Sequence, residues 1–392
     1  MNVCTRYPDN TIASRHLLLI GVLLLGAMLP SVTRAAIPVP SAPELAARAY
    51  LLMDVNSGKL LAEDNADERM EPASLTKLMT AYIAFEELKS GTIHLDDMVL
   101  ISEKAWRMGG SKMFIEVNKR VSVEKLLKGM IIQSGNDASV ALAEHIAGTE
   151  DAFATLMNSY AENLGMTNTH FVNATGMPDR DHYTTARDLA KLAVAIIKES
   201  PDHYAWYSIK KYTYNGITQY NRNKLLWRDK YVDGLKTGHT ESAGYCLIAS
   251  AKRDDMRLLS VVLGTRSENA RAQESDKLLN YGFHFFETRP LYTANTPLTK
   301  TRIWEGNVEN LDLGLAKDLY ITIPRGRYDK LKATMNIDGT IIAPVDKGQA
   351  LGTVDITLEG EQIDSQPLIS LHDVTAGDFF QRMSDKVMLM FE

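Results

Sequence analysis

The sequence has little cysteine, no excess of positive charge and no clustered histidines. Only Cys4 and Cys246 occur among its 392 residues, which excludes a disulfide-stapled scaffold. Lysine and arginine number 43 against 49 acidic residues, giving a net charge of −6, and no basic run favours a nucleic-acid partner. The 9 histidines are scattered and form no His-Glu-x-x-His pattern. The absence of that pattern disfavours a zinc peptidase, and we expect neither a metal nor a cofactor.

The one strongly apolar run lies near the N-terminus. Arg6 and Arg15 precede an apolar stretch from Leu17 to Leu29, and small residues follow up to Ala36. This pattern is typical of an export signal over residues 1–36, cleaved after Ala35 or Ala36. An uncleaved membrane helix is the alternative, but the run is shorter than the roughly 20 residues that a span needs. Cleavage would remove Cys4 and leave Cys246 as a buried, unpaired thiol.

Length and composition indicate two domains. A chain of 392 residues with 45% hydrophobic content can bury at least one full core. Proline-containing stretches at 289–290 and 295–297 suggest a boundary. We expect a first domain over residues 37–293, a second over 294–375, and a terminal segment over 376–392.

The first domain combines a strand pattern at each end with helical periodicity between them. A hairpin is expected at Ala49–Asp54 and Lys59–Ala62. Further strands and helices follow the patterns of alternation and of the 3.6-residue repeat. The expected strands are Tyr212–Ile217, Val232–Thr237, Tyr245–Ala251 and Arg257–Gly264, and the expected helices are Val123–Ile132, Ala138–Ile146, Asp151–Leu164, Thr184–Lys198 and Glu268–Phe286. An N-terminal hairpin joined to three late strands, with helices on both faces, predicts an α/β sandwich.

The C-terminal third shows short alternating runs and then an amphipathic segment. The runs Leu319–Ile323, Leu331–Ile337 and Val354–Leu358 predict a small all-β domain. The tail, Asp378–Glu392, places apolar side chains along one helical face and charged ones opposite. Such a helix is too short and too charged to span a bilayer. It should lie either in a membrane surface or against its own domain.

Ser74 and Lys77 stand three residues apart in a segment where Pro72 can begin a helix. A serine hydroxyl attacks at neutral pH only when a base takes its proton, and a lysine amine is a base only when neutral. Lys77 therefore needs burial or a second cation nearby to lower its pKa. The same spacing occurs at 122/125 and 208/211, so spacing alone is not specific.

Two further motifs follow in order. Ser134-Gly135-Asn136 falls between two expected helices, where Asp137 is expected to cap the second helix. Lys236-Thr237-Gly238 ends an expected strand. Ser-x-x-Lys, Ser-x-Asn and Lys-Thr-Gly in this order are the signature of β-lactamases and penicillin-binding proteins. The glycine-bearing loop at 108–111 either borders a cleft or merely connects elements.

Three of these side chains have roles in the chemistry that the trio predicts. Ser74 attacks a carbonyl, and Lys77 takes its proton, kept neutral by burial and by the charge of Lys236. Ser134 can relay that proton to the leaving amine.

The remaining motif residues suit substrate binding. Asn136 can hold the substrate's amide, while Lys236 and Thr237 can dock a terminal carboxylate. Gly238 lets a ligand's backbone approach closely. The backbone N–H groups of Ser74 and His239 could form an oxyanion hole.

From Ala49 to its end, the chain resembles the type-5 low-molecular-mass penicillin-binding proteins, which are serine-type D-alanyl-D-alanine carboxypeptidases. The stretches that carry this resemblance are 72–77, 133–137, 221–223, 232–240 and, in the second domain, 323–327.

The resemblance implies a β-lactamase-like antiparallel sheet flanked by helices, and a periplasmic enzyme of cell-wall synthesis and cell shape. Such an enzyme removes the last D-alanine from peptidoglycan stem pentapeptides and is acylated by β-lactams. The resemblance also implies that the C-terminal helix anchors the protein peripherally to the outer face of the inner membrane. Arg222 would lie near the substrate's carboxylate, unless it forms an ordinary surface ion pair.

Two other functions share these motifs. A β-lactamase differs in how fast water clears the acyl-enzyme, and class A enzymes use a glutamate for that step. The Glu-x-x-Leu-Asn segment that usually carries it is absent here, so we expect slow release of bound penicillin. A penicillin-binding wall sensor without turnover is the second alternative.

Overall fold

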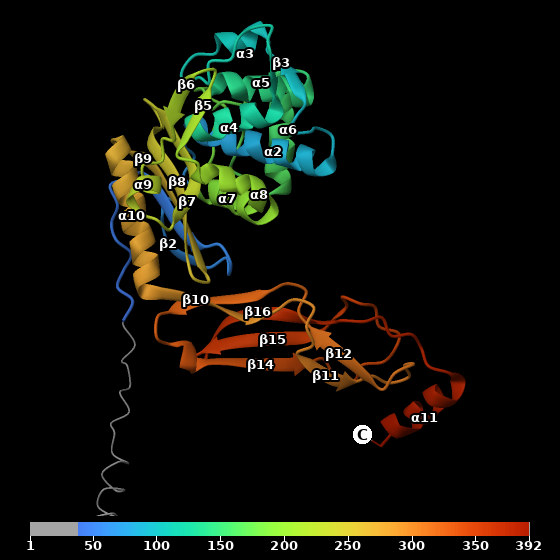
Figure 1. The fold of residues 1–392 in the computed structure, drawn as a ribbon. Helices are drawn as coiled ribbons and strands as arrows, with labels where there is room; N and C mark the ends of the chain where they lie inside the picture. The colour runs from blue at the N-terminus through green and yellow to red at the C-terminus, as the bar shows by residue number, and fades with distance from the viewer. Residues whose placement is uncertain (1–37, 392) are drawn as a thin grey trace, which may run out of the picture.

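The computed structural model describes residues 38–391, and the expected export signal lies outside them. Figure 1 shows two domains, with the helices gathered in the first and a separate group of strands below it that ends in a terminal helix. The predicted α/β sandwich, all-β domain and terminal helix are therefore confirmed.

One antiparallel sheet of five strands organises the first domain, in the order β2-β1-β9-β8-β7. The N-terminal hairpin joins the three late strands, as predicted. β7 lies at the edge and carries the Lys-Thr-Gly motif in its C-terminal half, so one side of that motif is free of strand pairing. The strands are β1 (Ala49–Asp54), β2 (Leu60–Asp64), β7 (Val232–Thr240), β8 (Gly244–Arg253) and β9 (Met256–Thr265).

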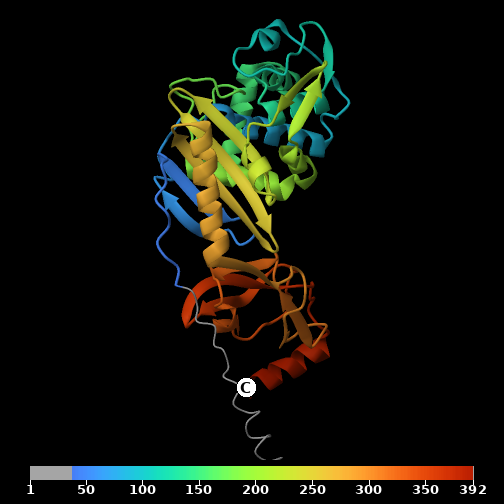
Figure 2. The ribbon, with the colours of Figure 1, turned by 60° about the vertical axis from the view of Figure 1, so that its left-hand side comes forward.

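Helices cover both faces of this sheet (Figures 1 and 2). Successive side chains of a strand point to opposite faces. Leu51 accordingly packs in the core shared with the helical block, whereas Leu52 packs in the core shared with α10 (Glu268–Phe285). The block on the other face consists of α2 (Lys77–Ser90), α3 (Glu103–Arg107), α4 (Val123–Gln133), α5 (Asn136–Ala147), α6 (Glu150–Asn163), α7 (Ala186–Glu199) and α8 (Pro201–Tyr204).

The strand expected at Tyr212–Ile217 is wrong in its extent. The structure has a hairpin of β5 (Lys211–Tyr214) and β6 (Ile217–Tyr220), separate from the main sheet. Asn215 and Gly216 at its turn have φ of 48° and 75°. Asn-Gly with both φ positive is the preferred two-residue hairpin turn, and it breaks the expected strand in the middle. Short elements nearby are β3 (Met98–Leu100), β4 (Arg120–Ser122), η2 (Ala205–Ser208) and α9 (Leu225–Arg228).

The second domain has a five-stranded antiparallel sheet in the order β11-β12-β16-β15-β14, and a separate pair β10–β13. By this pairing the domain begins at Phe286, before the boundary expected at 293. Its strands are β10 (Phe286–Tyr292), β11 (Thr299–Arg302), β12 (Asn310–Gly314), β13 (Leu319–Pro324), β14 (Leu331–Ile337), β15 (Ala350–Leu358) and β16 (Glu361–Ser370), with the short helix η3 (Tyr328–Lys330). Hydroxyl contacts at the junction link Ser57 to Thr322, at 2.6 Å, and Thr322 to Thr288, at 2.8 Å.

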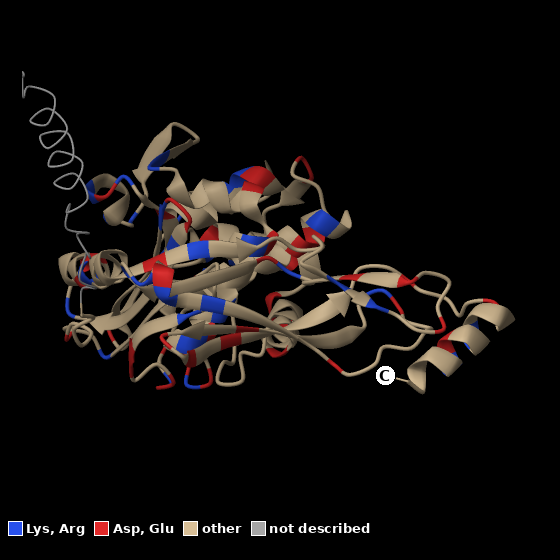
Figure 3. Cartoon of the chain, turned by 90° about the horizontal axis from the view of Figure 1, so that it is seen from below, with Lys and Arg blue, Asp and Glu red and all other residues tan. Residues whose placement is uncertain are grey.

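The terminal helix α11 (Phe379–Leu389) contacts the second domain through polar groups. Asp385 accepts a hydrogen bond from the Glu305 backbone N–H at 2.7 Å, and Arg382 and Lys386 lie near the Glu305 carboxylate. Most apolar side chains of this segment are exposed, although the Met388 sulfur lies 3.9 Å from the Arg302 guanidinium of the second domain. The exposed ones are Phe379, Phe380, Met383, Val387, Met388, Met390 and Phe391. Within residues 38–391, none of the helices has the length and apolar content that crossing a membrane requires. Figure 3 shows charges of both signs interspersed over both domains.

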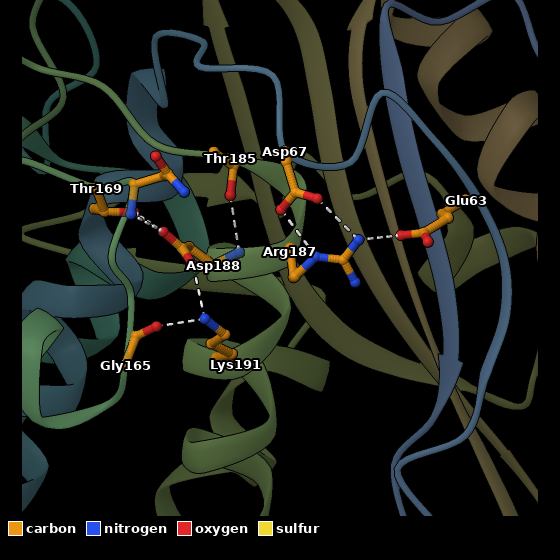
Figure 4. Close-up of polar contacts among 9 residues, drawn as sticks. Glu63, Asp67, Gly165, Thr169, Thr185, Arg187, Asp188 and Lys191 are labelled. Atoms are coloured by element: carbon orange, nitrogen blue, oxygen red, sulfur yellow. Dashed lines mark hydrogen bonds and ion pairs between the residues drawn. The ribbon is translucent and has the colours of Figure 1, made fainter.

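Polar contacts at the start of α7 tie the helical block to the hairpin and to a preceding loop (Figure 4). Thr185 caps the helix by accepting from the Asp188 N–H at 3.1 Å. The buried Asp188 carboxylate accepts from the Asn168 N–H at 2.8 Å and the Thr169 hydroxyl at 2.9 Å, and pairs with Lys191. These contacts fix the loop that leads from α6 toward the cavity described below.

The two kinds of contact in this network should differ in strength. Asp188→Ala should lower the free energy of unfolding by about 2–3 kcal/mol, because two partly buried donors lose their shared, buried acceptor. Arg187, which pairs with Asp67 and Glu63 at the surface, should matter less. Arg187→Met should cost about 1 kcal/mol or less, and less still in high salt. Chemical denaturation at two salt concentrations measures both, and equal losses would contradict this account.

Candidate active site

Ser74 and Lys77 are brought together by a short 3-10 helix, η1 (Ala73–Thr76), which runs directly into α2. Pro72 stands at its N-cap, as the sequence predicts for a helix start. In a 3-10 helix, side chains three residues apart eclipse one another. The Lys77 Nζ atom lies 3.0 Å from the half-buried Ser74 Oγ atom.

The Lys77 amine is buried and has three polar neighbours. Besides Ser74 it lies 2.7 Å from the Asn136 Oδ1 atom and 2.5 Å from the Thr175 carbonyl oxygen. Burial, as the main cause, and the Arg222 charge together lower the pKa of Lys77 to about 7, while the Asp137 charge opposes the shift. A neutral amine has two N–H donors and one lone pair. Its donors satisfy Asn136 and Thr175, so the lone pair faces the Ser74 hydroxyl.

Ser134 lies at the C-terminus of α4 in the left-handed conformation, with φ of 68°. This conformation is uncommon for residues other than glycine and is often retained at functional sites. It lets the chain reverse between α4 and α5, where Asn136 begins the second helix. The buried Ser134 hydroxyl accepts a hydrogen bond from the Lys236 amine at 2.8 Å. The loop motif thus contacts both lysines, Lys77 through Asn136 and Lys236 through Ser134.

The expectation that Asp137 caps α5 is wrong. Gly135 occupies the N-cap, and Asp137 lies in the first turn. Its carboxylate accepts hydrogen bonds from the backbone N–H groups of Met113 and Phe114, both at 2.8 Å. A buried carboxylate binds several backbone donors strongly, and here it fixes the preceding loop. That loop brings Gly110 and Ser111 to the cavity, so the 108–111 segment borders a cleft.

Lys236 is as deeply buried as Lys77, and this alters the expected distribution of charge. Burial holds the pKa of Lys236 well below its ordinary value, and the charges of Lys77, Arg222 and Arg271 act in the same direction. Lys236 was expected to carry a fixed charge that keeps Lys77 neutral. The structure instead places two buried amines in one site, where a charge on either amine disfavours a charge on the other.

A cavity of about 420 Å³ gathers the predicted residues. Its lining includes Ser74, Ser134, Asn136, Arg222, Thr237, Gly238 and His239. Lys77 and Lys236 lie beneath this lining and reach it through the hydroxyls of Ser74 and Ser134. A Cβ atom on Gly238 would stand 3.0 Å from the Pro72 carbonyl oxygen, so glycine lets β7 approach the turn that carries Ser74. All nine predicted site residues therefore meet at one cavity, and their roles remain predictions.

The sequence interpretation missed two parts of the cavity. One is the loop 175–177, which is shaped by Asn173, whose side-chain oxygen accepts from the N–H groups of Thr175 and Gly176. Asparagine with glycine three residues later is typical of a β-turn and could have indicated it. The other is Arg271 of α10, which donates to the Gly238 carbonyl at 3.1 Å. No local pattern marks Arg271, because only the packing of α10 on the sheet brings it there.

The accidental motif copies have structural roles of their own. Ser122 stands at the N-cap of α4. A second Ser-x-Asn, Ser267 with Asn269, follows the Lys-Thr-Gly motif, and its Ser267 caps α10 by accepting from the Ala270 N–H at 3.0 Å. The Ser208 hydroxyl donates to the Ala205 carbonyl at 2.7 Å. Serine is favoured at helix ends, so these copies arise without any link to the cavity.

A substitution at Gly176 tests how closely the missed loop must approach Ser74. Gly176 has φ of 83°, and a Cβ atom would stand 1.7 Å from the Ala73 carbonyl oxygen. Gly176→Ala should therefore displace the loop and slow acylation of Ser74 by about 100-fold, the cost of a 1 Å misplacement. Gly216→Ala is the matched control, since its φ is 75° and no atom lies within 4 Å of the added Cβ. Equal acylation rates in the two variants would contradict this prediction.

Two family models match the chain. The model described as D-alanyl-D-alanine carboxypeptidase matches residues 36–267, and the model of the penicillin-binding protein 5 C-terminal domain matches residues 286–376. The D-alanyl-D-alanine carboxypeptidase DacC of Escherichia coli (strain K12) is 46% identical over 365 residues, which cover 91% of each chain.

Solved structures agree. Penicillin-binding protein 5 from Haemophilus influenzae superimposes with a TM-score of 0.82 at 44% identity, covering 86% of this chain and 99% of that one. Penicillin-binding protein D2 from Listeria monocytogenes, in its ampicillin-bound form, gives a TM-score of 0.58 at 32% identity, covering 62% of this chain and all of that one, at 100%. The resemblance inferred from the motifs is confirmed: the chain belongs to the serine-type D-alanyl-D-alanine carboxypeptidases of the penicillin-binding protein 5 type.

Proposed function

We propose that this D-alanyl-D-alanine carboxypeptidase trims peptidoglycan stem pentapeptides through an acyl-enzyme on Ser74, with Lys77 as the general base. The observation that carries the proposal is the buried Lys77 amine, 3.0 Å from the Ser74 Oγ atom and with a pKa lowered to about 7. A base with a pKa near the working pH is the most effective general base.

Acylation then follows from the placement of the groups. Lys77 takes the proton of the Ser74 hydroxyl as Oγ attacks the carbonyl carbon of the penultimate D-alanine. The negative charge that develops on the carbonyl oxygen would be stabilised by the backbone N–H groups of Ser74 and His239. When the C–N bond breaks, Ser134 passes its proton to the leaving nitrogen and regains one from the pair of lysine amines, which returns Lys77 to its neutral form.

Substrate binding would change the charge on the second lysine. A terminal carboxylate entering beside Lys236, Thr237 and Arg222 brings a negative charge, which favours the protonated form of Lys236. Protonated Lys236 in turn disfavours a charge on Lys77, so the substrate itself would help to keep the base neutral. Asn136, already bonded to Lys77, would hold the amide that precedes the scissile bond.

Water completes the cycle. Lys77 is the group placed to activate a water molecule against the acyl-enzyme, because the glutamate segment of class A β-lactamases is absent from the sequence. β-Lactams would therefore acylate Ser74 and leave slowly, which favours a carboxypeptidase over a β-lactamase.

We further propose that the enzyme is exported to the periplasm and held at the outer face of the inner membrane. The composition of residues 1–36 supports export. The exposed apolar side chains of α11 support a membrane contact, since the helix contacts the second domain mainly through polar groups and leaves most of its apolar side chains exposed. The second domain would then hold the cavity away from the membrane, toward the wall.

Release of D-alanine tests the chemistry. Wild-type protein incubated with a peptide ending in D-alanyl-D-alanine should release free D-alanine, and Ser74→Ala should release none above the uncatalysed rate, because the nucleophile is gone. Equal release from both proteins would overturn the role of Ser74. Release from neither, with penicillin still bound covalently to the wild type, would favour a sensor, and rapid turnover of penicillin would favour a β-lactamase.

The pH dependence tests the base. Because Lys77 acts only when neutral, the acylation rate should rise with pH through about 7 and fall about tenfold for each pH unit below it. Lys77→Arg should abolish acylation at every pH up to 9, since a guanidinium stays protonated. Stopped-flow or quenched reactions with a fluorescent penicillin measure these rates. A pH-independent rate between 5 and 9 would be inconsistent with Lys77 as the base.

Vesicle binding tests the membrane contact. The double variant Phe380→Ser/Phe391→Ser should bind anionic phospholipid vesicles at least about tenfold more weakly, because each buried aromatic side chain contributes roughly 2 kcal/mol. Phe114→Ser is the matched control, an exposed phenylalanine of the first domain. Co-sedimentation of the chain from Ala36 onward gives the affinities. Equal binding by all three proteins would exclude α11 as the contact.

A further inference from the structure

The loop 172–182, between α6 and α7, packs against η1 and the first turn of α2, where Lys77 lies. Three of its groups contact the helix that carries the base. The Thr175 carbonyl lies 2.5 Å from the Lys77 amine, and the Ala174 carbonyl accepts from the Thr80 hydroxyl at 2.8 Å. The third contact is made by His182, which lies 2.8 Å from the Thr76 hydroxyl.

His182 is 2% exposed, and both of its ring nitrogens are engaged. The Val172 backbone N–H donates to Nδ1 at 3.1 Å, so Nδ1 carries the lone pair. The ring proton is therefore on Nε2, which donates to the Thr76 Oγ1 atom at 2.8 Å. One neutral side chain thus joins the η1 turn, two residues from Ser74, to the start of the loop that contacts Lys77.

The surroundings of His182 keep it neutral. Burial lowers the pKa of His182 to about 4, His170 and Lys77 act in the same direction, and Asp179 opposes them. The Phe171 ring packs against it edge-to-face, with ring centroids 5.7 Å apart. A neutral imidazole supplies one donor and one acceptor without adding a second cation beside Lys77.

We infer that His182 is a positioning residue for acylation. It clamps the loop 172–182 onto the η1 turn, and so keeps the Thr175 carbonyl, the Lys77 amine and the Ser74 hydroxyl within hydrogen-bond distance of one another along the chain of contacts. The inference rests on the roles proposed above for Ser74 and Lys77. His182 lines no part of the cavity and acts only through Thr76 and Val172.

This clamp has a chemical consequence for Lys77. If the loop moves away from the turn, the Lys77 amine loses an acceptor and gains access to water. Burial is the main cause that lowers its pKa from 10.5, so hydration would raise the pKa again. The fraction of neutral base at pH 7 would then fall, and the acid limb of the rate profile would move to higher pH.

Two substitutions separate the hydrogen bonds from the volume of the ring. His182→Phe keeps a ring and removes both bonds. His182→Gln keeps an acceptor for the Val172 N–H and a donor for the Thr76 hydroxyl. The matched control is His170→Phe, two residues before the loop, since His170 is half-buried, bonds the Asp181 carbonyl and, within the described residues, forms no hydrogen bond to η1 or α2.

The experiment measures the acylation rate by fluorescent penicillin between pH 5 and 9, kcat and KM for a D-alanyl-D-alanine peptide, and the thermal midpoint of each variant. His182→Phe should acylate about 10- to 100-fold more slowly at pH 7, the range expected for a small displacement of reacting groups, with KM changed less than about threefold. The acid limb of the rate profile of His182→Phe should move to higher pH by at least about one unit, because the Lys77 amine becomes less buried and its pKa rises. His182→Gln should recover most of the wild-type rate, and His170→Phe should match the wild type.

Three results would overturn the inference. They are an unchanged acylation rate in His182→Phe, a slower rate without a shift of the acid limb, and an equal loss in His170→Phe. If the folded fraction of His182→Phe is too small to assay, Thr76→Val removes the same hydroxyl contact, and its failure to slow acylation counts equally against the clamp. Failure of the proposed function is distinguishable, because it would appear as wild-type protein that is not labelled on Ser74.

Discussion

Burial of two lysine amines beside one cavity is the constraint on which the rest of the first domain depends. Taking an ammonium group out of water costs several kcal/mol, so a fold that buries two must surround them with polar partners. The Lys77 amine bonds the Asn136 side chain and a loop carbonyl, and the Lys236 amine bonds the Ser134 hydroxyl and a carbonyl of its own strand. Each partner comes from a different element, so the strand, both helix ends and the loop must all pack correctly before the site exists.

The global architecture was predictable because it follows from local periodicity. The alternation in the hairpin and the late strands, and the 3.6-residue repeat between them, are properties of each segment alone. Leu51 and Leu52 illustrate this, since neighbouring apolar residues in a strand must face two separate cores. The expected strand Tyr212–Ile217 runs across this hairpin because residues typical of strands stand on both sides of Asn215-Gly216, and only the turn chemistry marks the break.

The motif residues were predictable as a set, but their electrostatics were not. Order and spacing identify Ser74, Ser134 and Lys236, whereas the charge on each amine depends on burial, which arises from the whole fold. Asp137 shows the same limit. Its position suggests a helix cap, yet its carboxylate accepts hydrogen bonds from backbone N–H groups that lie more than twenty residues earlier in the chain. Arg271 reaches the cavity, and His182 reaches the η1 turn behind it, only through tertiary packing, so no local pattern identifies them.

The unpaired edge of β7 determines which features of a bound peptide the cavity can recognise. An unpaired strand edge offers main-chain donors and acceptors, and an extended peptide laid along it is held through groups that every amino acid possesses. Recognition of that kind is indifferent to most side chains but sensitive to chirality, because inverting one α-carbon turns its substituent into the sheet or away from it. Stem peptides of varied composition would therefore be accepted, while their unusual stereochemistry would supply the selectivity.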